Sequence, residues 1–191
     1  MPPRTPARER ILSAAARCFY AHGIAATGID TVIAEAGVAK MSLYNNFANK
    51  SALVEGYIDA RHQEWMDLHR LRAADAHSPQ ERVLAVFDAY LDHAQGAYQN
   101  GFRGCGLLNA AGELPVGDPA RAAVARHKAE VQAIVITALR ELVDETSATQ
   151  LTEHLAFLLE GSMSLAGLEG SPDRILHART LAQALLNGLQ R

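Results

Sequence analysis

The chain has 191 residues, of which 49% are hydrophobic and 20% are charged, and its formal net charge is −3 at pH 7. This apolar share can fill a core and excludes a largely disordered chain. Its two cysteines, Cys18 and Cys105, lie too far apart for a zinc finger or a disulfide scaffold. No apolar run reaches the roughly 18 to 20 residues that span a bilayer, and the N-terminus lacks the apolar core of a signal peptide. We therefore expect a cytoplasmic protein that does not enter a membrane.

The charges are distributed unevenly along the chain. Residues 1–50 contain six Lys or Arg against three Asp or Glu, whereas residues 51–191 contain twelve against eighteen. A basic segment joined to an acidic body favours contact between that segment and a polyanion. A solvated surface also produces such charge runs, so the pattern alone does not identify the polyanion.

Helix signals dominate the chain. Three pairs place a capping residue directly before a proline, as at the start of a helix: Ser78-Pro79, Asp118-Pro119 and Ser171-Pro172. No sustained alternation of β-branched residues and no Asn-Gly or Asp-Gly hairpin turn occurs. We predict an all-α fold of about nine helices, at 7–22, 28–36, 40–46, 50–72, 79–99, 104–113, 119–144, 148–168 and 172–190. The change from short to long helices near residue 50 predicts two domains, 1–49 and 50–191.

The segment 27–47 has the pattern of a helix, a glycine turn and a second helix. Thr27 is the expected N-cap of the first helix, and Gly37 stands where that helix must end, because glycine tolerates the left-handed conformation. Leu43 and Phe47 are spaced i, i+4 in the second helix and are expected to face inward. The remaining positions of that helix are polar or carry hydrogen-bond donors.

Such a helix suits the major groove of DNA, which admits one helix and is read through donors, acceptors and methyl groups. Lys40 can donate to guanine or to phosphate, Asn45 or Asn46 can pair with adenine, and Met41 can contact a thymine methyl. The expected DNA-binding residues are Thr27, Ala39, Lys40, Met41, Ser42, Tyr44, Asn45, Asn46 and Lys50. The alternative is an ordinary helical hairpin whose polar face is merely solvated.

Several positions of this segment resemble the TetR family of bacterial transcriptional regulators. The matching residues are Ile33-Ala34-Glu35-Ala36-Gly37-Val38, Leu43-Tyr44-Asn45-Asn46-Phe47, Lys50 and Leu53, preceded by Ile11, Leu12, Ala15, Phe19 and Gly23. Residues 101–118 resemble, more loosely, a segment of the family's ligand domains. Two positions depart from the pattern, because Ala39 stands where the family often has a capping Ser or Thr, and Met41 where Gly or Pro is common.

The resemblance implies an N-terminal three-helix DNA-binding domain followed by a helical effector-binding and dimerisation domain. It also implies a homodimer that binds a near-palindromic operator in double-stranded DNA, and a repressor that a small, largely apolar effector releases. The last two helices, which are rich in small residues and leucines, would form the dimer interface.

The larger domain combines apolar stripes with a few polar side chains, the composition of a ligand pocket. The expected effector-binding residues are Phe87, Tyr90, His93, Cys105, Asn109, Glu113, His127, Val131, Phe157 and Glu160. The alternative for each of them is a role in the core or at the surface.

The motifs of common enzyme classes do not occur. GxSxG, the Walker A loop, HExxH and paired Glu-x-x-His elements are all missing from the sequence. We expect no catalysis, no cofactor and no bound metal. Two alternatives stay open: a metal- or redox-sensing regulator of the same fold, suggested by eight histidines and Cys105, and a helical interaction module without DNA binding.

Overall fold

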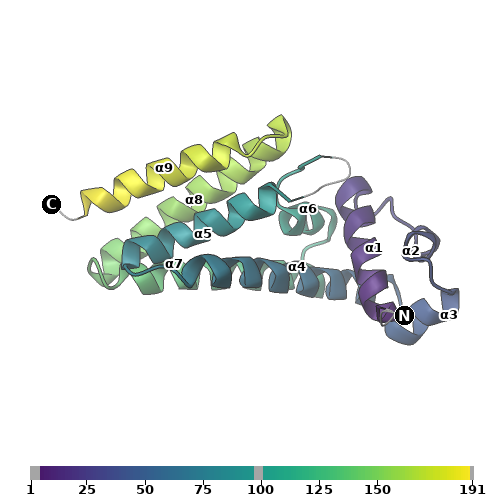
Figure 1. Cartoon of the computed structure of the whole chain (residues 1–191). Coiled ribbons are helices and arrows are strands. Elements are labelled where there is room, and N and C mark those ends of the chain that lie inside the picture. Colours follow the sequence, from purple (N-terminus) through teal and green to yellow (C-terminus); the bar gives the residue numbers. More distant parts are fainter. Residues whose placement is uncertain (1–4, 97–100, 190–191) are drawn as a thin grey trace. The chain divides into compact units, whose positions relative to one another are not determined.

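The computed structural model describes residues 5–96 and 101–189, and this part of the chain is helical without strands. The helices confirm the predicted all-α fold (Figure 1). They are α1 (Ala7–His22), α2 (Ile29–Ala36), α3 (Lys40–Asn46), α4 (Lys50–Ala73), α5 (Pro79–Ala94), α6 (Gly106–Glu113), α7 (Pro119–Leu139), α8 (Glu145–Glu169) and α9 (Asp173–Gly188).

The described residues divide into two compact units. The first contains residues 5–62 and 106–125, and the second contains 63–96, 101–105 and 126–189. Helices α4 and α7 therefore contribute residues to both units, and α6 belongs to the first. This division by packing does not coincide with the boundary expected at residue 50, which concerns the two functions and stays a prediction.

In the first unit, α1 packs against α2, α3 and α6. The buried face of α1 is apolar and includes Ile11 and Phe19, and the ring of Phe19 meets Tyr57 edge-on at 5.5 Å between centroids. Leu43 and Phe47 are both buried, as their i, i+4 spacing predicted. Burial of these two side chains fixes which side of α3 faces the core.

The turn between α2 and α3 is a Schellman motif. The amide of Gly37 donates to the carbonyl of Ala34 at 3.2 Å, and the amide of Val38 donates to that of Ile33 at 3.3 Å. Gly37 has φ +60°, the left-handed conformation expected at this position. Arg10 on α1 secures the same turn, because its Nη2 donates to the carbonyls of Ala36 at 2.7 Å and Gly37 at 2.6 Å.

Glu113 was expected to bind an effector, but in the structure its carboxylate binds backbone amides. Its carboxylate, at the end of α6, accepts hydrogen bonds from the amides of Ile24 at 3.0 Å and Ala25 at 2.7 Å. It thereby ties α6 to the loop between α1 and α2. Gly23 in that loop has φ +89°, and a Cβ added there would lie 2.8 Å from Oε1 of Glu113. The glycine is thus required both by the backbone and by the carboxylate.

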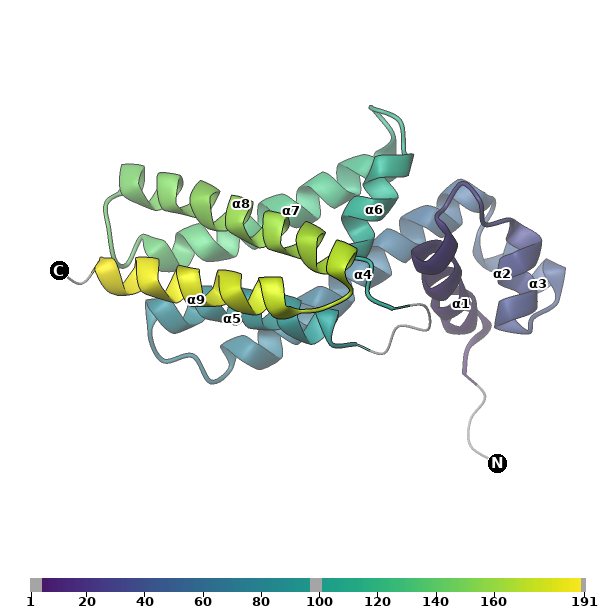
Figure 2. The same cartoon turned by 90° about the horizontal axis from the view of Figure 1, so that it is seen from above.

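In the second unit, α9 packs against both α8 and α5, and Figure 2 shows α9 beside α8 and in front of α5. Buried side chains of all three helices form the core: Val83, Phe87, Tyr90, Leu155, Leu159, Met163, Ile175, Ala182 and Leu186. Arg179 of α9 joins α5 through two hydrogen bonds to Asp88, of 2.5 and 3.0 Å.

Side-chain caps explain where several helices begin. Ser78 and Glu81 form the predicted capping box of α5. Asp144 accepts hydrogen bonds from the amides of Thr146 and Ser147 and starts α8 at Glu145. The predicted end of α7 at residue 144 and the predicted start of α8 at residue 148 were therefore wrong. Sequence periodicity runs through this turn, but the aspartate cap overrides it.

Three further expectations about helix ends need correction. Helix α2 has Gly28 as its N-cap, because the buried hydroxyl of Thr27 donates to the carbonyl of Gly23 at 2.7 Å instead. Helix α9 begins at Asp173, one residue after Pro172. Helix α5 ends at Ala94, and the predicted extension beyond residue 96 lies outside the described residues.

We predict that Gly37→Ala lowers the free energy of unfolding by roughly 1 to 2 kcal/mol, because a side chain disfavours the left-handed conformation. The added Cβ would also lie 3.1 Å from Nη2 of Arg10. Urea unfolding followed by circular dichroism measures this change. Gly112→Ala in α6 is the matched control, since a Cβ there meets nothing within 4 Å and alanine is the better helix former. An equal loss in both variants would contradict the prediction.

We predict that Glu113→Gln speeds amide hydrogen exchange at Ile24 and Ala25 and lowers stability by about 1 kcal/mol. A glutamine offers one acceptor oxygen where the two amides now use two. Exchange followed by NMR reports on each amide separately. Glu55→Gln, at an exposed position of α4, serves as the control. Unchanged protection of the Ala25 amide in Glu113→Gln would show that the carboxylate does not hold the loop.

Candidate nucleic-acid interface and effector cavity

Helix α3 presents its polar side to solvent. Leu43 is fully buried, whereas 69% of Met41 and 42% of Tyr44 are exposed. The other exposed or half-exposed residues of the predicted interface are Ala39, Lys40, Ser42, Asn45, Asn46 and Lys50. The structure therefore gathers these residues on the outward side of α3 and at the start of α4.

Thr27 does not share this surface. Only 2% of it is exposed, and its hydroxyl lies within hydrogen-bonding distance of the carbonyls of Gly23 and Cys18. A threonine can satisfy its hydroxyl through the preceding turn instead of capping the next helix. The assignment of Thr27 to the DNA interface stays a prediction, which its burial does not support.

Lys40 lies at the first position of α3 and pairs with Asp30 of α2, with 3.0 Å between Nζ and Oδ1. The hydrogen bond and the charge of Asp30 raise the pKa of Lys40 above its usual range. Both side chains are exposed, so water and salt screen the pair. A DNA phosphate or a guanine can therefore compete with Asp30 for the ammonium group.

The two asparagines of α3 differ in their surroundings. Nδ2 of Asn46 donates to the carbonyl of Ser42 on its own helix at 2.7 Å, whereas Asn45 is exposed without such a bond to α3 among the described hydrogen bonds. Asn45 is thus the better placed of the two to pair with an adenine edge.

The helix starts near this surface have different caps. Ala39 precedes α3 without a side-chain cap, as its chemistry requires. Asn49 caps α4 by accepting from the amide of Ala52 at 2.9 Å. Lys50 follows it directly, so a cation stands beside the free amides of a helix N-terminus, where phosphates bind favourably.

Sequence analysis missed Arg8 and Arg10. The guanidinium of Arg8 lies 5.4 Å from the centroid of the Phe47 ring, and Arg10 binds the turn carbonyls described above. Both reach residues more than 25 positions away, and no local pattern indicates such a partner.

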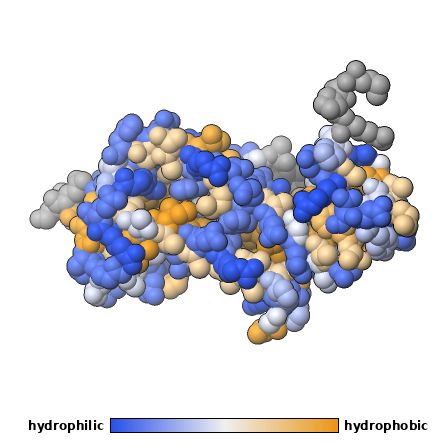
Figure 3. Space-filling model, turned by 90° about the horizontal axis from the view of Figure 1, so that it is seen from below, coloured by the Kyte–Doolittle hydropathy of each residue, from blue (hydrophilic) through white to orange (hydrophobic). Residues whose placement is uncertain are grey.

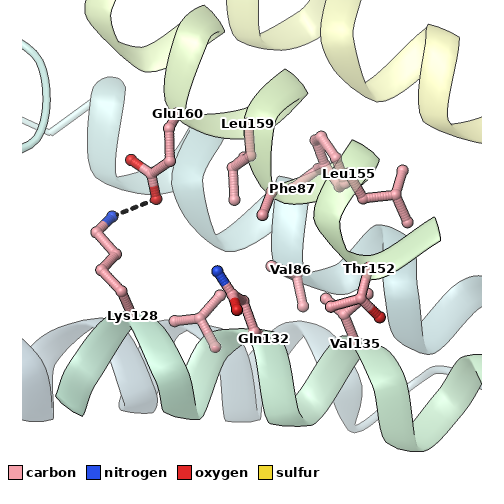
Figure 4. Close-up of a pocket in the computed structure, with 11 residues that line it drawn as sticks. Val86, Phe87, Lys128, Gln132, Val135, Thr152, Leu155, Leu159 and Glu160 are labelled. Atoms are coloured by element: carbon pink, nitrogen blue, oxygen red, sulfur yellow. Dashed lines mark hydrogen bonds and ion pairs between the residues drawn. The ribbon is translucent and has the colours of Figure 1, made fainter. Parts of the chain in front are cut away.

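A small cavity in the second unit lies between α5, α7 and α8, as Figure 4 shows. Its walls are mostly apolar, and three predicted effector-binding residues, Phe87, Val131 and Glu160, line it. The other lining residues are Val86, Lys128, Gln132, Val135, Thr152, Leu155, Ala156 and Leu159. Its volume of about 20 Å³ holds little more than one water molecule, whereas ligand pockets typically measure roughly 300 Å³ or more.

Lys128, which sequence analysis missed, organises the polar end of this cavity. Its Nζ donates to Oε1 of Glu160 at 2.5 Å and to the hydroxyl of Tyr90 at 3.0 Å. It also lies 5.1 Å from the centroid of the Tyr90 ring. The signal for Lys128 was its position on the apolar stripe of α7, four residues after Val124 and three before Val131.

Burial and the Lys128 partners perturb both titrating groups. Burial raises the pKa of Tyr90 far above its usual range, so its hydroxyl stays protonated. Burial alone would lower the pKa of Lys128, but Cys105, Tyr90 and Glu160 together raise it. Lys128 is therefore a cation, and with the Glu160 carboxylate it forms a largely buried ion pair.

The remaining predicted effector-binding residues do not line this cavity. His127 is buried edge-on against Trp65, His93 lies against Phe102, and Cys105 is buried. Phe157 lies on α8 with 72% of it exposed. Asn109 is an exposed residue of the first unit, so effector binding by Asn109 and Phe157 stays a prediction without support from this cavity.

Residues 5–96 and 101–189 lack two further features. They contain no group of three or more His, Cys, Asp or Glu side chains arranged to hold a metal ion. Within the same residues, none of the helices combines the length and apolarity needed to cross a membrane.

Comparisons with known proteins agree with this arrangement. A family profile described as "Bacterial regulatory proteins, tetR family" matches residues 11–57. A second, "Tetracyclin repressor-like, C-terminal domain", matches residues 79–182, more than half of the chain.

Among solved structures, the chain is similar to SCO4454, a TetR-family transcriptional regulator from Streptomyces coelicolor. The two are 28% identical, with 98% of each chain covered and a TM-score of 0.87. Regulatory protein TetR from Rhodobacter sphaeroides shares the fold, with 24% identity over 94% of this chain and 98% of that one, and a TM-score of 0.79.

Among curated proteins, the HTH-type transcriptional regulator TtgR of Pseudomonas putida is 38% identical over 56 residues. That match spans 29% of this chain and only about a quarter, 27%, of TtgR. The profiles cover both the helix-turn-helix and the larger helical region, and the chain therefore belongs to the TetR family of transcriptional regulators, with a DNA-binding helix-turn-helix near its N-terminus.

Proposed function

We propose that this protein is a homodimeric repressor that binds a near-palindromic operator and leaves it when a small, largely apolar effector binds. The exposed polar face of α3, opposite the buried Leu43, is the observation that carries the proposal. A helix held in this way can enter the major groove with Lys40, Met41 and Asn45 toward the bases. Tyr44 and Lys50 would then contact phosphates.

Exposed leucines of α8 and α9 support the homodimer. Leu165, Leu168, Leu176, Leu181 and Leu185 are all exposed large apolar side chains on these two neighbouring helices. Helix α9 lies nearest the viewer in Figure 2, whereas the view from the opposite side in Figure 3 shows hydrophilic residues with apolar ones scattered among them. A self-complementary apolar face of this kind suits a two-fold interface. Two recognition helices about 34 Å apart, or a multiple of it, would then read two half-sites.

The small volume of the cavity supports effector control. An effector of ordinary size cannot enter a space of about 20 Å³ unless α5, α7 and α8 move apart. Binding would therefore favour a different packing of these helices. If the effector binds this packing more tightly than the DNA-bound one, it shifts the protein away from the DNA-bound state and releases the operator. Helix α4 contains residues of both compact units and is the element that we propose carries the change to the DNA-binding residues.

Selection of bound fragments from random duplex DNA tests the proposal directly. We expect enrichment of a near-palindrome with half-sites about one helical turn apart or a multiple of it. Enrichment of sequences without internal symmetry would contradict binding as a two-fold dimer. If the protein does not retard DNA in a gel at low salt, the alternative of a helical interaction module without DNA binding is favoured.

We predict that Lys50→Ala weakens binding to every DNA sequence and lowers the slope of log K against log salt by about one unit, because one phosphate contact is lost. Fluorescence anisotropy on a labelled duplex at several salt concentrations gives the slope. Arg140→Ala removes the same charge from the turn that follows α7 and should leave the slope unchanged. A slope that Lys50→Ala does not alter would remove Lys50 from the phosphate contacts.

We predict that Leu185→Asp converts the dimer into monomers and weakens operator binding more than tenfold, because a buried unpaired charge opposes association. Light scattering coupled to gel filtration measures the mass, and DNA retardation measures the affinity. Leu71→Asp, at an exposed position of α4, is the control and should stay dimeric. A Leu185→Asp protein that keeps the mass of the unmodified dimer would place the interface elsewhere.

A further inference from the structure

The cavity between α5, α7 and α8 has one polar end. Figure 4 shows Lys128 and Glu160 together at this end, with Phe87, Leu155 and Leu159 beyond them. Thr152 also lines the cavity, but its hydroxyl already donates to the carbonyl of Ala148 at 2.8 Å. The polar groups of the wall that a ligand can meet are therefore the amide of Gln132 and the Lys128–Glu160 pair, and only the pair is charged.

The carboxylate of Glu160 is only half satisfied. Its Oε1 accepts from Lys128, whereas its Oε2 is buried and accepts no hydrogen bond from any described residue. A buried acceptor without a donor costs stability, and a ligand that supplies the donor recovers that cost. A site with an unpaired acceptor also rejects analogues that lack the donor.

The charge at this end selects a neutral ligand. Lys128 balances the charge of Glu160, so the pair as a whole is neutral. A cationic ligand would meet the ammonium of Lys128, and an anionic ligand would place its charge against the Glu160 carboxylate. In surroundings of low dielectric, both arrangements cost more than they do in water.

Most of the remaining wall is apolar and selects an apolar body. Phe87, Val131 and Leu159 offer no polar side-chain atom, and the present volume of about 20 Å³ means that any ligand must displace some of these side chains. A compact and rigid apolar group displaces the fewest of them and gains the most burial per atom.

We propose that Glu160 Oε2 is the acceptor that recognises the effector, and that the effector class is a neutral, compact apolar molecule with one N–H or O–H donor. This inference rests on the proposed role of the cavity as the effector site. It assigns to Glu160 a specificity role and to Lys128 the role of a positioning residue that orients the carboxylate and cancels its charge.

Four small probes test the assignment on the full-length protein. Indole carries one N–H donor, benzofuran has nearly the same size without a donor, benzamidinium is a cation and benzoate is an anion. Titration followed by the methyl NMR signals of Val131 and Leu159 gives a dissociation constant for each probe. We expect both ions to bind at least tenfold more weakly than indole.

The informative quantity is the dissociation constant of benzofuran divided by that of indole. The apolar contribution to binding is nearly the same for both probes, so the ratio reports on the N–H donor. In Glu160→Gln, Lys128 attracts the amide oxygen and leaves the amide nitrogen, a donor, where Oε2 was. We expect the ratio to fall about tenfold, the loss of one hydrogen bond to a charged acceptor. Glu153→Gln makes the same change at an exposed position of α8 and should leave the ratio unaltered.

A second variant guards against misfolding of Glu160→Gln, because removal of one partner leaves the Lys128 charge buried and unpaired. Lys128→Met combined with Glu160→Leu removes both charges and keeps the volume similar. The same fall in the ratio is expected in this double variant. A ratio that neither variant lowers, benzamidinium binding more tightly than indole, or no shift of the cavity methyl signals with indole would each overturn the assignment.

DNA retention measured at saturating indole separates this inference from the proposed function. If indole binds through Glu160 and the DNA stays bound, the donor assignment stands and the proposed coupling to the operator fails. If a probe releases DNA but the ratio does not depend on Glu160, the coupling stands and the assignment fails.

Discussion

The DNA-binding surface depends on how the seven residues of α3 are held. Within this helix only Leu43 is buried, and Phe47 follows directly as the second buried anchor. So short a helix has little stability of its own in water, and it persists because these two side chains pack into the first unit. The same two contacts fix the rotation of α3 about its axis. The other residues of the helix therefore face solvent. The polar surface is thus a consequence of the apolar anchors.

The Schellman turn sets the direction in which α3 leaves α2, and two long-range contacts stabilise it and the loop before it. Arg10 binds the carbonyls at the end of α2, and Glu113 binds the amides of the loop that precedes α2. Arg10 satisfies carbonyls that the end of α2 leaves unpaired, and Glu113 satisfies amides of a loop outside any helix. The carboxylate of Glu113 comes from α6, which precedes α7, one of the three helices that line the cavity. A change that moves α6 would therefore act on the loop before α2 through a defined pair of hydrogen bonds.

The sequence was sufficient to predict the features that local chemistry determines. The i, i+4 pair Leu43 and Phe47, the glycine at position 37 and the Ser78–Glu81 capping box each depend on residues a few positions apart, and the structure has them as expected. The errors concern partners that are distant in sequence or caps that compete. Glu113 binds amides 88 and 89 residues away, which no periodicity indicates. Thr27 had two local options, and the hydroxyl bonds to the preceding turn.

The cavity residues also show that a sequence pattern does not identify partners that are distant in the chain. Apolar stripes predicted that Phe87 and Val131 would be buried, but they could not say which polar residue would share their space. Lys128 interrupts the stripe of α7 and is retained in the interior with Glu160. A buried ion pair is often worth less stability than an apolar pair of similar volume. A largely buried Lys–Glu pair with one acceptor still unpaired is therefore a poor device for stability, and it is well suited to discriminate between molecules that do and do not bring a donor. The cost in folding free energy and the selectivity for an effector arise from the same unpaired oxygen.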